Sequence, residues 1–161
     1  MSTACLDNHI LIWGIRQEAT LGQESMILRA ELFLKHLEET KTAVIVPSIV
    51  IGEFLVKVAI EKHEEVQAEL EKRFRIVPYD AAAAACAARI FQEQKASKTV
   101  VENTPRDVLK ADIQILATAI TRKVGTLYTH DGPLTKLAEK YLTVKQMPEG
   151  LGKQTEMFGT I

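Results

Sequence analysis

Residues 43–53 read AVIVPSIVIGE, and this stretch decides the fold class. The run over residues 43–46 predicts a buried strand, because β-branched side chains pack well on a pleated sheet. Pro47 ends the strand, since proline has no N–H to donate to the ladder. Ser48 is expected to cap a helix that continues to about Ile60. A buried strand that leads directly into an apolar helix is typical of an α/β protein.

The same alternation of short apolar runs and helical segments extends over most of the 161-residue chain. Strands are expected at residues 3–6, 43–46, 75–77, 126–128 and 143–145. Helices are expected at residues 8–16, 24–39, 48–60, 63–73, 81–95, 105–123 and 133–141. Strands that alternate with helices predict a parallel sheet covered on both faces. In such sheets, ligands bind beyond the carboxyl ends of the strands.

The composition is that of a globular domain, with 47% hydrophobic and 25% charged residues. Lys and Arg total 20 against 21 Asp and Glu, so the net charge of −1 provides no overall basic field to hold nucleic acid. Any contact with nucleic acid must therefore be local or carried by metal ions. The two cysteines are too few for a disulfide framework, and no signal peptide or membrane span is evident, which together predict a cytoplasmic protein.

Four acidic residues stand where chemistry is expected. Asp7 and Asp131 follow two of the predicted strands, whereas Glu53 and Asp112 lie on predicted helices in apolar surroundings. Carboxylates that converge at one place repel one another and raise each other's pKa, and a divalent cation removes that repulsion. A donor set made of oxygen alone, without a His or Cys cluster, favours Mg²⁺ or Mn²⁺ over zinc. Such ions can activate water and stabilise a leaving oxygen.

Each of these acids also has a purely structural interpretation. Asp7 could cap the helix that follows it, and Asp131 could cap a helix or form a turn. Glu53 could pair with Lys57 one helical turn away, and Asp112 could be a solvated helix residue. The spacing of the four acids alone leaves both interpretations open.

Four segments, in this order, resemble the PIN-domain family of metal-dependent nucleases. They read CLDNHILIW at residues 5–13, VPSIVIGE at 46–53, DIQILATA at 112–119 and LYTHD at 127–131. In that family the first acid follows the opening strand, and the second lies on a helix after a strand and a proline. A further helix carries the third acid, and a strand ending in Thr, any residue and Asp carries the fourth.

The resemblance spans about residues 3–145 and implies a three-layer α/β/α sandwich with a central, mostly parallel sheet. It implies a PIN-like nuclease domain over residues 1–147 and a C-terminal tail over residues 148–161. The chain departs from the family at two positions. Asn8 and His9 stand where the family often has Thr or Ser and then Asn or Ser.

The resemblance also implies a site and a reaction. Asp7, Glu53, Asp112 and Asp131 would be the catalytic residues and would bind Mg²⁺ or Mn²⁺. The reaction would be hydrolysis of phosphodiester bonds, most often in RNA. Single-domain members are commonly VapC-type toxins, which pair with a small antitoxin and usually dimerise. The expected partners are therefore an RNA substrate, an antitoxin and a second copy of the chain.

A non-catalytic module with the same fold, which binds protein or RNA, is the alternative hypothesis. Degenerate members usually lose acids, whereas this sequence keeps four, which favours activity. His9 and His130 flank two of the acids and could contact phosphate, or could be partly exposed side chains beside turns. Thr129 could likewise bond to a phosphate or simply pack at a strand end. Trp13 is expected in the core rather than as a surface for base stacking.

Overall fold

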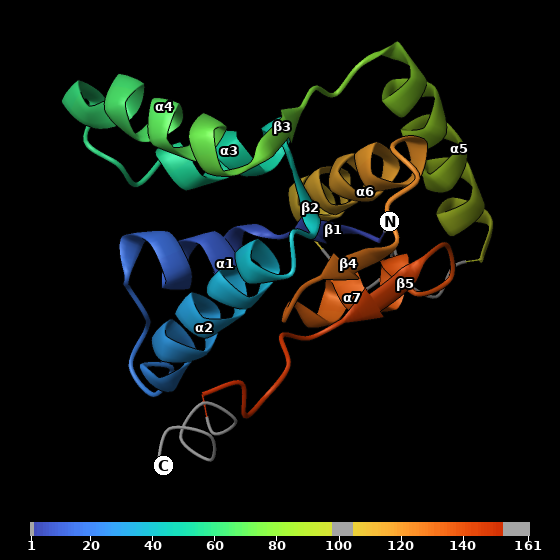
Figure 1. The fold of residues 1–161 in the computed structure, drawn as a ribbon. Helices are drawn as coiled ribbons and strands as arrows, with labels where there is room; N and C mark the ends of the chain where they lie inside the picture. The colour runs from blue at the N-terminus through green and yellow to red at the C-terminus, as the bar shows by residue number, and fades with distance from the viewer. Residues whose placement is uncertain (1, 98–104, 153–161) are drawn as a thin grey trace, which may run out of the picture.

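Parallel strands form the central layer of the computed structural model, which describes residues 2–97 and 105–152 (Figure 1). The strands are β1 (Thr3–Leu6), β2 (Ala43–Pro47), β3 (Arg75–Val77), β4 (Thr126–Tyr128) and β5 (Thr143–Lys145). Their order in the sheet is β3-β2-β1-β4-β5. The central strand is β1, in which Cys5 lies level with Ile45 on one side and Leu127 on the other. The predicted strands and the parallel sheet are confirmed.

Helices connect the strands and cover both faces of the sheet (Figure 1). They are α1 (Asn8–Leu11), the π-helical segment η1 (Ile12–Arg16), α2 (Ser25–Glu39), α3 (Ser48–Leu55), the 3₁₀ turn η2 (Ile60–Lys62), α4 (His63–Arg73), α5 (Ala81–Ser97), α6 (Arg106–Thr121) and α7 (Gly132–Ala138). The region predicted as one helix over residues 48–60 is therefore shorter in the structure, because α3 ends at Leu55.

Two apolar cores lie on opposite faces of the sheet, because successive side chains of a strand point to opposite sides. Ala4 and Leu6 of β1 belong to the core that α1, α2, α3 and α4 cover. Cys5, between them, belongs to the second core, which α5, α6 and α7 cover. This arrangement confirms the predicted three-layer α/β/α sandwich. Trp13 is buried in the first core, as expected.

The start of α3 differs from the expectation that Ser48 caps the helix. Pro47 occupies the N-cap position, and Ser48 is the first helical residue. The Ser48 hydroxyl instead accepts a hydrogen bond from the backbone N–H of Tyr79, at 3.3 Å. The serine therefore ties the beginning of α3 to the chain that follows β3, a contact between segments far apart in the sequence.

Residues near the end of the described chain return to α2. Leu151 packs against the first core, and Arg29 of α2 donates a hydrogen bond to the carbonyl of Met147. The remainder of the predicted tail, residues 153–161, lies outside the described residues. Among the helices of residues 2–97 and 105–152, none is both long enough and apolar enough to cross a membrane.

Candidate functional site

A pocket of about 360 Å³ opens at the carboxyl ends of β1 and β4, and all four predicted acids line it. Its lining consists of Asp7, Asn8, His9, Glu53, Asp107, Val108, Ala111, Asp112, Ile115 and Asp131. The four acids come from positions spread over most of the chain, so the tertiary fold brings them together. The pocket lies where a parallel α/β sheet is expected to bind its ligand.

The two strand-end acids are neighbours because β1 and β4 pair directly. Leu6 is level with Tyr128 in the sheet, and the backbone N–H of Asp7 donates to the Tyr128 carbonyl at 3.2 Å. Asp7 is then the N-cap of α1, and Asp131 is the N-cap of α7. Their carboxylates accept hydrogen bonds from Asn8 N–H and Leu134 N–H, at 2.7 and 2.8 Å. The capping interpretation is thus correct for both acids, and it coexists with their position in the pocket.

Helices α3 and α6 supply the other two acids. Helix α3 packs against both α1 and α6, which places Glu53 and Asp112 on the same pocket as Asp7. Within the described part of the chain, Glu53 forms no ion pair with Lys57. Asp112 is half-buried rather than a solvated helix residue. The Glu53–Lys57 pair is therefore absent from the described residues, and Asp112 is only partly exposed to solvent.

Thr129 links the two strand-end acids through one buried hydroxyl. Its Oγ1 donates to Asp7 Oδ2 at 2.9 Å and accepts the backbone N–H of Asp131 at 3.1 Å. The side chain is completely buried, so its hydroxyl is held in this arrangement. Thr129 therefore orients Asp7 and the Asp131 backbone, a role different from both roles considered from the sequence.

The electrostatics of the pocket show the cost of gathering acids there. Burial, then the negative charges of Asp131, Asp7 and Glu53, raise the pKa of Asp112 from 3.8 to about 7. The pKa of Glu53 is also raised, first by burial and then by the nearby Asp7. Both raised pKa values indicate that the negative charges of the pocket are not fully balanced by positive groups of the protein.

Two histidines and Trp13 form an aromatic group beside the acids. The His9 ring stacks on Trp13 with centroids 5.6 Å apart, and His130 meets Trp13 edge-on at 5.5 Å. His9 Nδ1 lies 3.8 Å from Asp7 Oδ2, and this acid raises the pKa of His9, whereas burial lowers it. His130 Nε2 accepts the Met147 N–H at 3.0 Å, so in the neutral ring the proton is on Nδ1. His9 alone of the two lines the pocket.

The donor set of the pocket fits a hard divalent cation. Its four central carboxylates provide only oxygen atoms, and their mutual repulsion is the condition that a cation relieves. Asn8 adds a buried amide oxygen that has no hydrogen-bond partner among the described residues. In the described part of the chain, no three His, Cys, Asp or Glu side chains already form a ligand set. The four carboxylates line the same pocket.

The sequence reasoning missed some of the pocket residues. Asp107 lines the pocket one turn before Ala111 on α6, on the same side of the helix. Helical spacing from Asp112 could have found it, but α6 carries both acidic and basic residues in its first turns. Val108, which is 44% exposed, adds an apolar side chain to the rim.

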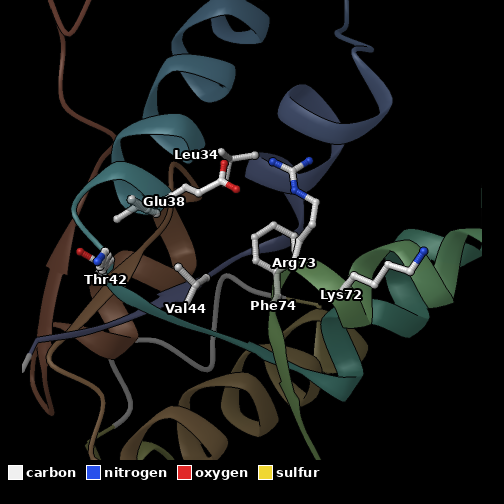
Figure 2. A pocket seen from close by; sticks show the side chains of 9 residues that line it. Leu34, Glu38, Thr42, Val44, Lys72, Arg73 and Phe74 are labelled. Carbon is white, nitrogen blue, oxygen red and sulfur yellow. The ribbon is translucent and has the colours of Figure 1, made fainter.

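A second pocket, of about 290 Å³, lies near the amino ends of β2 and β3, far from the four acids along these strands (Figure 2). Leu34, Val44 and Phe74 contribute its apolar lining, with Arg73 and Glu38 among its charged side chains (Figure 2). Glu38 is the single carboxylate among its described lining residues. It therefore lacks the donors that the first pocket offers to a cation, and we assign it no part in the site.

Comparisons with known proteins agree with this architecture. The PIN domain family model matches residues 4–140. No curated protein sequence matches the chain. A chain of DNA-bound VapBC from Salmonella typhimurium is similar in structure, with a TM-score of 0.65, 17% identity, and coverage of 92% of this chain and 100% of that one. A chain of VapBC2 from Rickettsia felis, bound to a promoter DNA fragment, gives a TM-score of 0.60, 17% identity, and coverage of 91% and 99%.

The family match begins within β1, includes β2, β3 and β4, and contains the four predicted acids of the pocket. The two similar structures extend the agreement in fold to nearly the whole chain. This chain belongs to the PIN domain family.

Proposed function

We propose that this protein is a ribonuclease that hydrolyses RNA phosphodiester bonds with a divalent cation, Mg²⁺ or Mn²⁺. Asp7, Glu53, Asp112 and Asp131 would hold the cation. The observation that carries the proposal is the gathering of these four acids, distant in sequence, around one pocket in a PIN domain. An acidic pocket repels a phosphodiester unless a cation neutralises the carboxylates. Binding of the phosphodiester therefore requires binding of the cation.

The residues of the chain would divide the work. A divalent cation held by these acids would activate water and would neutralise negative charge on the phosphate. Asp7 is the most buried of the acids, and the Thr129 hydroxyl holds its Oδ2 in one orientation. Glu53 and Asp112 line the pocket from α3 and α6, and because their pKa values are raised, a bound cation would have to displace their protons.

We propose further that the protein is the toxin of a toxin–antitoxin pair and forms homodimers. The support is the fold shared with chains of two VapBC complexes. Exposed apolar side chains near the end of α3, Val56 at 80% and Ile60 at 82%, offer surface that a protein partner could cover. Copurification with the product of an adjacent small gene, followed by inhibition of cleavage, tests the antitoxin.

The first experiment is cleavage of mixed single-stranded RNA by the wild type in Mg²⁺, Mn²⁺ or EDTA. Asp7→Asn removes one ligand charge while nearly keeping the shape of the side chain. Glu139→Gln, an exposed acid outside the pocket, is the matched control. We expect cleavage by the wild type and by Glu139→Gln in either metal, and its loss in EDTA and in Asp7→Asn.

The alternative, a non-catalytic binding module, predicts a different pattern. A well-folded wild type that cleaves no RNA in either metal would contradict the nuclease. Cleavage that survives in Asp7→Asn would instead show that the activity arises outside this pocket.

A further inference from the structure

A cavity of about 650 Å³ lies between α5 and α6, next to the acidic pocket. Asp107 lines both spaces, so the two are neighbours across the first turns of α6. The cavity is lined by Tyr79, Ala84, Ala87, Ala88, Phe91, Gln92, Arg106, Asp107, Lys110, Ile113 and Gln114. Its volume lies within the range of ordinary ligand pockets, about 300–1,000 Å³.

Small side chains on α5 create this space. Between the two half-buried aromatic residues, Tyr79 and Phe91, the side of α5 that faces the cavity carries only Ala84, Ala87 and Ala88. Methyl groups leave room that longer side chains would fill. The three alanines that line the cavity are therefore preceded in the chain by Tyr79 and followed by Phe91.

Both spaces share Asp107 of α6, but Arg106 and Lys110 of this helix line only the cavity. Asp112 and Ile115 line the acidic pocket, whereas Arg106 and Lys110, one turn apart, line the cavity. Neither cation forms an ion pair with any carboxylate in the described part of the chain. The two cationic side chains thus stand beside an acidic site, on the other side of the same helix.

We infer that this cavity binds an unpaired nucleotide of the RNA substrate, adjacent to the phosphodiester in the acidic pocket. The identity of the ligand as RNA rests on the proposed function. Aromatic side chains such as Tyr79 and Phe91 stack with unpaired bases, and the amides of Gln92 and Gln114 can hydrogen-bond to base edges. Arg106 and Lys110 attract the flanking phosphates.

The low net charge of the whole protein favours a local site of this kind. The net charge is −1, and the acidic pocket repels the backbone that it must receive. Cations on the neighbouring side of α6 counteract that repulsion where the strand enters. A nucleotide fixed in the cavity also sets which phosphate reaches the acids.

The first test fills the cavity without altering charge. Ala88→Leu places a larger side chain in it, and because Ala88 is exposed we expect the variant to fold, which its circular dichroism spectrum and melting temperature check. Ala85→Leu is the matched control, an exposed alanine of α5 that does not line the cavity. Binding of fluorescent single-stranded RNA homopolymers is measured in Mg²⁺ in the Asp112→Asn background, so that the probe stays intact. We expect Ala88→Leu to weaken binding about tenfold, the loss of one stacked base, and Ala85→Leu to leave it unchanged.

The second test removes one cation. Lys110→Gln should lower the slope of log affinity against log salt by about 0.7, the value for one phosphate contact on a single strand. Lys136→Gln on α7 is the control, because Lys136 is exposed and lines neither space. An unchanged slope in Lys110→Gln would overturn the assignment of this residue to a phosphate.

The outcomes separate this inference from the proposed function. Equal binding by Ala88→Leu and Ala85→Leu, or no binding by the parent protein, overturns the nucleotide site whatever the wild type cleaves. A change in oligomeric mass in Ala88→Leu alone also overturns it, because the cavity would then be an interface between copies. Selective loss of binding in Ala88→Leu supports the site, and an inactive wild type would then overturn only the proposed ribonuclease activity.

Discussion

Asp7 is a buried carboxylate, 5% exposed, with a defined set of partners. It accepts hydrogen bonds from Asn8 N–H and from the Thr129 hydroxyl, and His9 lies within ion-pair distance. A buried charge is costly unless such groups stabilise it. The partners of Asp7 therefore hold its carboxyl group in one position, as a metal ligand requires.

Thr129→Val tests this positioning. The variant keeps the shape of a completely buried side chain but removes the donor to Asp7 Oδ2. We expect Mn²⁺ affinity to fall about tenfold to a hundredfold, as it does when other outer-shell partners of metal ligands are removed. Calorimetric titration measures this change. Thr118→Val, also completely buried but bonded only to the Gln114 carbonyl, should bind Mn²⁺ like the wild type; equal affinities for all three proteins would contradict the role of Thr129.

Asp112→Asn should stabilise the protein in EDTA. The pKa of Asp112 is raised from 3.8 in the free group to about 7 in the fold. A group with a raised pKa contributes stability that is present below its unfolded pKa and is lost as the pH rises through its folded pKa. The variant cannot ionise and avoids that loss. Its advantage in melting temperature should grow as the pH rises from about 4 towards 7 and then level off; an advantage independent of pH would contradict this explanation.

At the scale of elements, short helices at strand ends hold the site. Helix α7 begins directly after β4, and Asp131 caps it through Leu134 N–H at 2.8 Å. The Thr135 hydroxyl also donates a hydrogen bond to the Asp131 carbonyl, at 2.7 Å. The Asp131 side chain thus both caps helix α7 and lines the pocket. Structural and functional roles coincide at this residue rather than exclude each other.

Asp131→Ser and Asp131→Ala separate the two roles. Serine is a good N-cap and alanine is not. The free energy of unfolding of the alanine variant should therefore be about 1 kcal/mol lower than that of the serine variant. Both variants lose the carboxylate, so both should lose metal-dependent cleavage. Urea unfolding in EDTA and cleavage in Mn²⁺ measure the two effects. If the serine variant kept full activity, the Asp131 carboxylate would have no role in the reaction.

At the scale of the whole molecule, the order of the strands creates the site. The central pair, β1 and β4, is far apart in sequence, and each strand delivers an acid at its carboxyl end. Helices α3 and α6, which pack against each other and against β2, deliver the others. The acids thus concentrate charge that destabilises the fold without a cation and stabilises it with one.

Divalent metal should therefore raise the melting temperature of the whole domain. A ligand that binds only the native state adds about 2.7 kcal/mol to the unfolding free energy at a hundred times its Kd. We expect Mn²⁺ to shift the thermal transition of the wild type and of the exposed-acid control Glu139→Gln. Asp7→Asn should show little shift. An equal shift in Asp7→Asn would place the stabilising cation at other carboxylates.

The sequence by itself determined the strands, the order of helices and the identity of four acids. Local features sufficed for these. The β-branched run before Pro47 and the apolar spacing in α6 specify element type, and the alternation of elements specifies a parallel sheet covered on both faces. The four PIN-like segments added the order in which the acids occur.

Only the tertiary structure decided which side chains meet. Local periodicity does not say which neighbour a helix face contacts, because that depends on pairing between distant segments. The hydroxyl of Thr129 became a partner of Asp7 only through the β1–β4 pairing. Likewise, Arg106 and Lys110 line a cavity because the alanines of α5 pack beside α6. Long-range packing, which no short segment encodes, sets these relations.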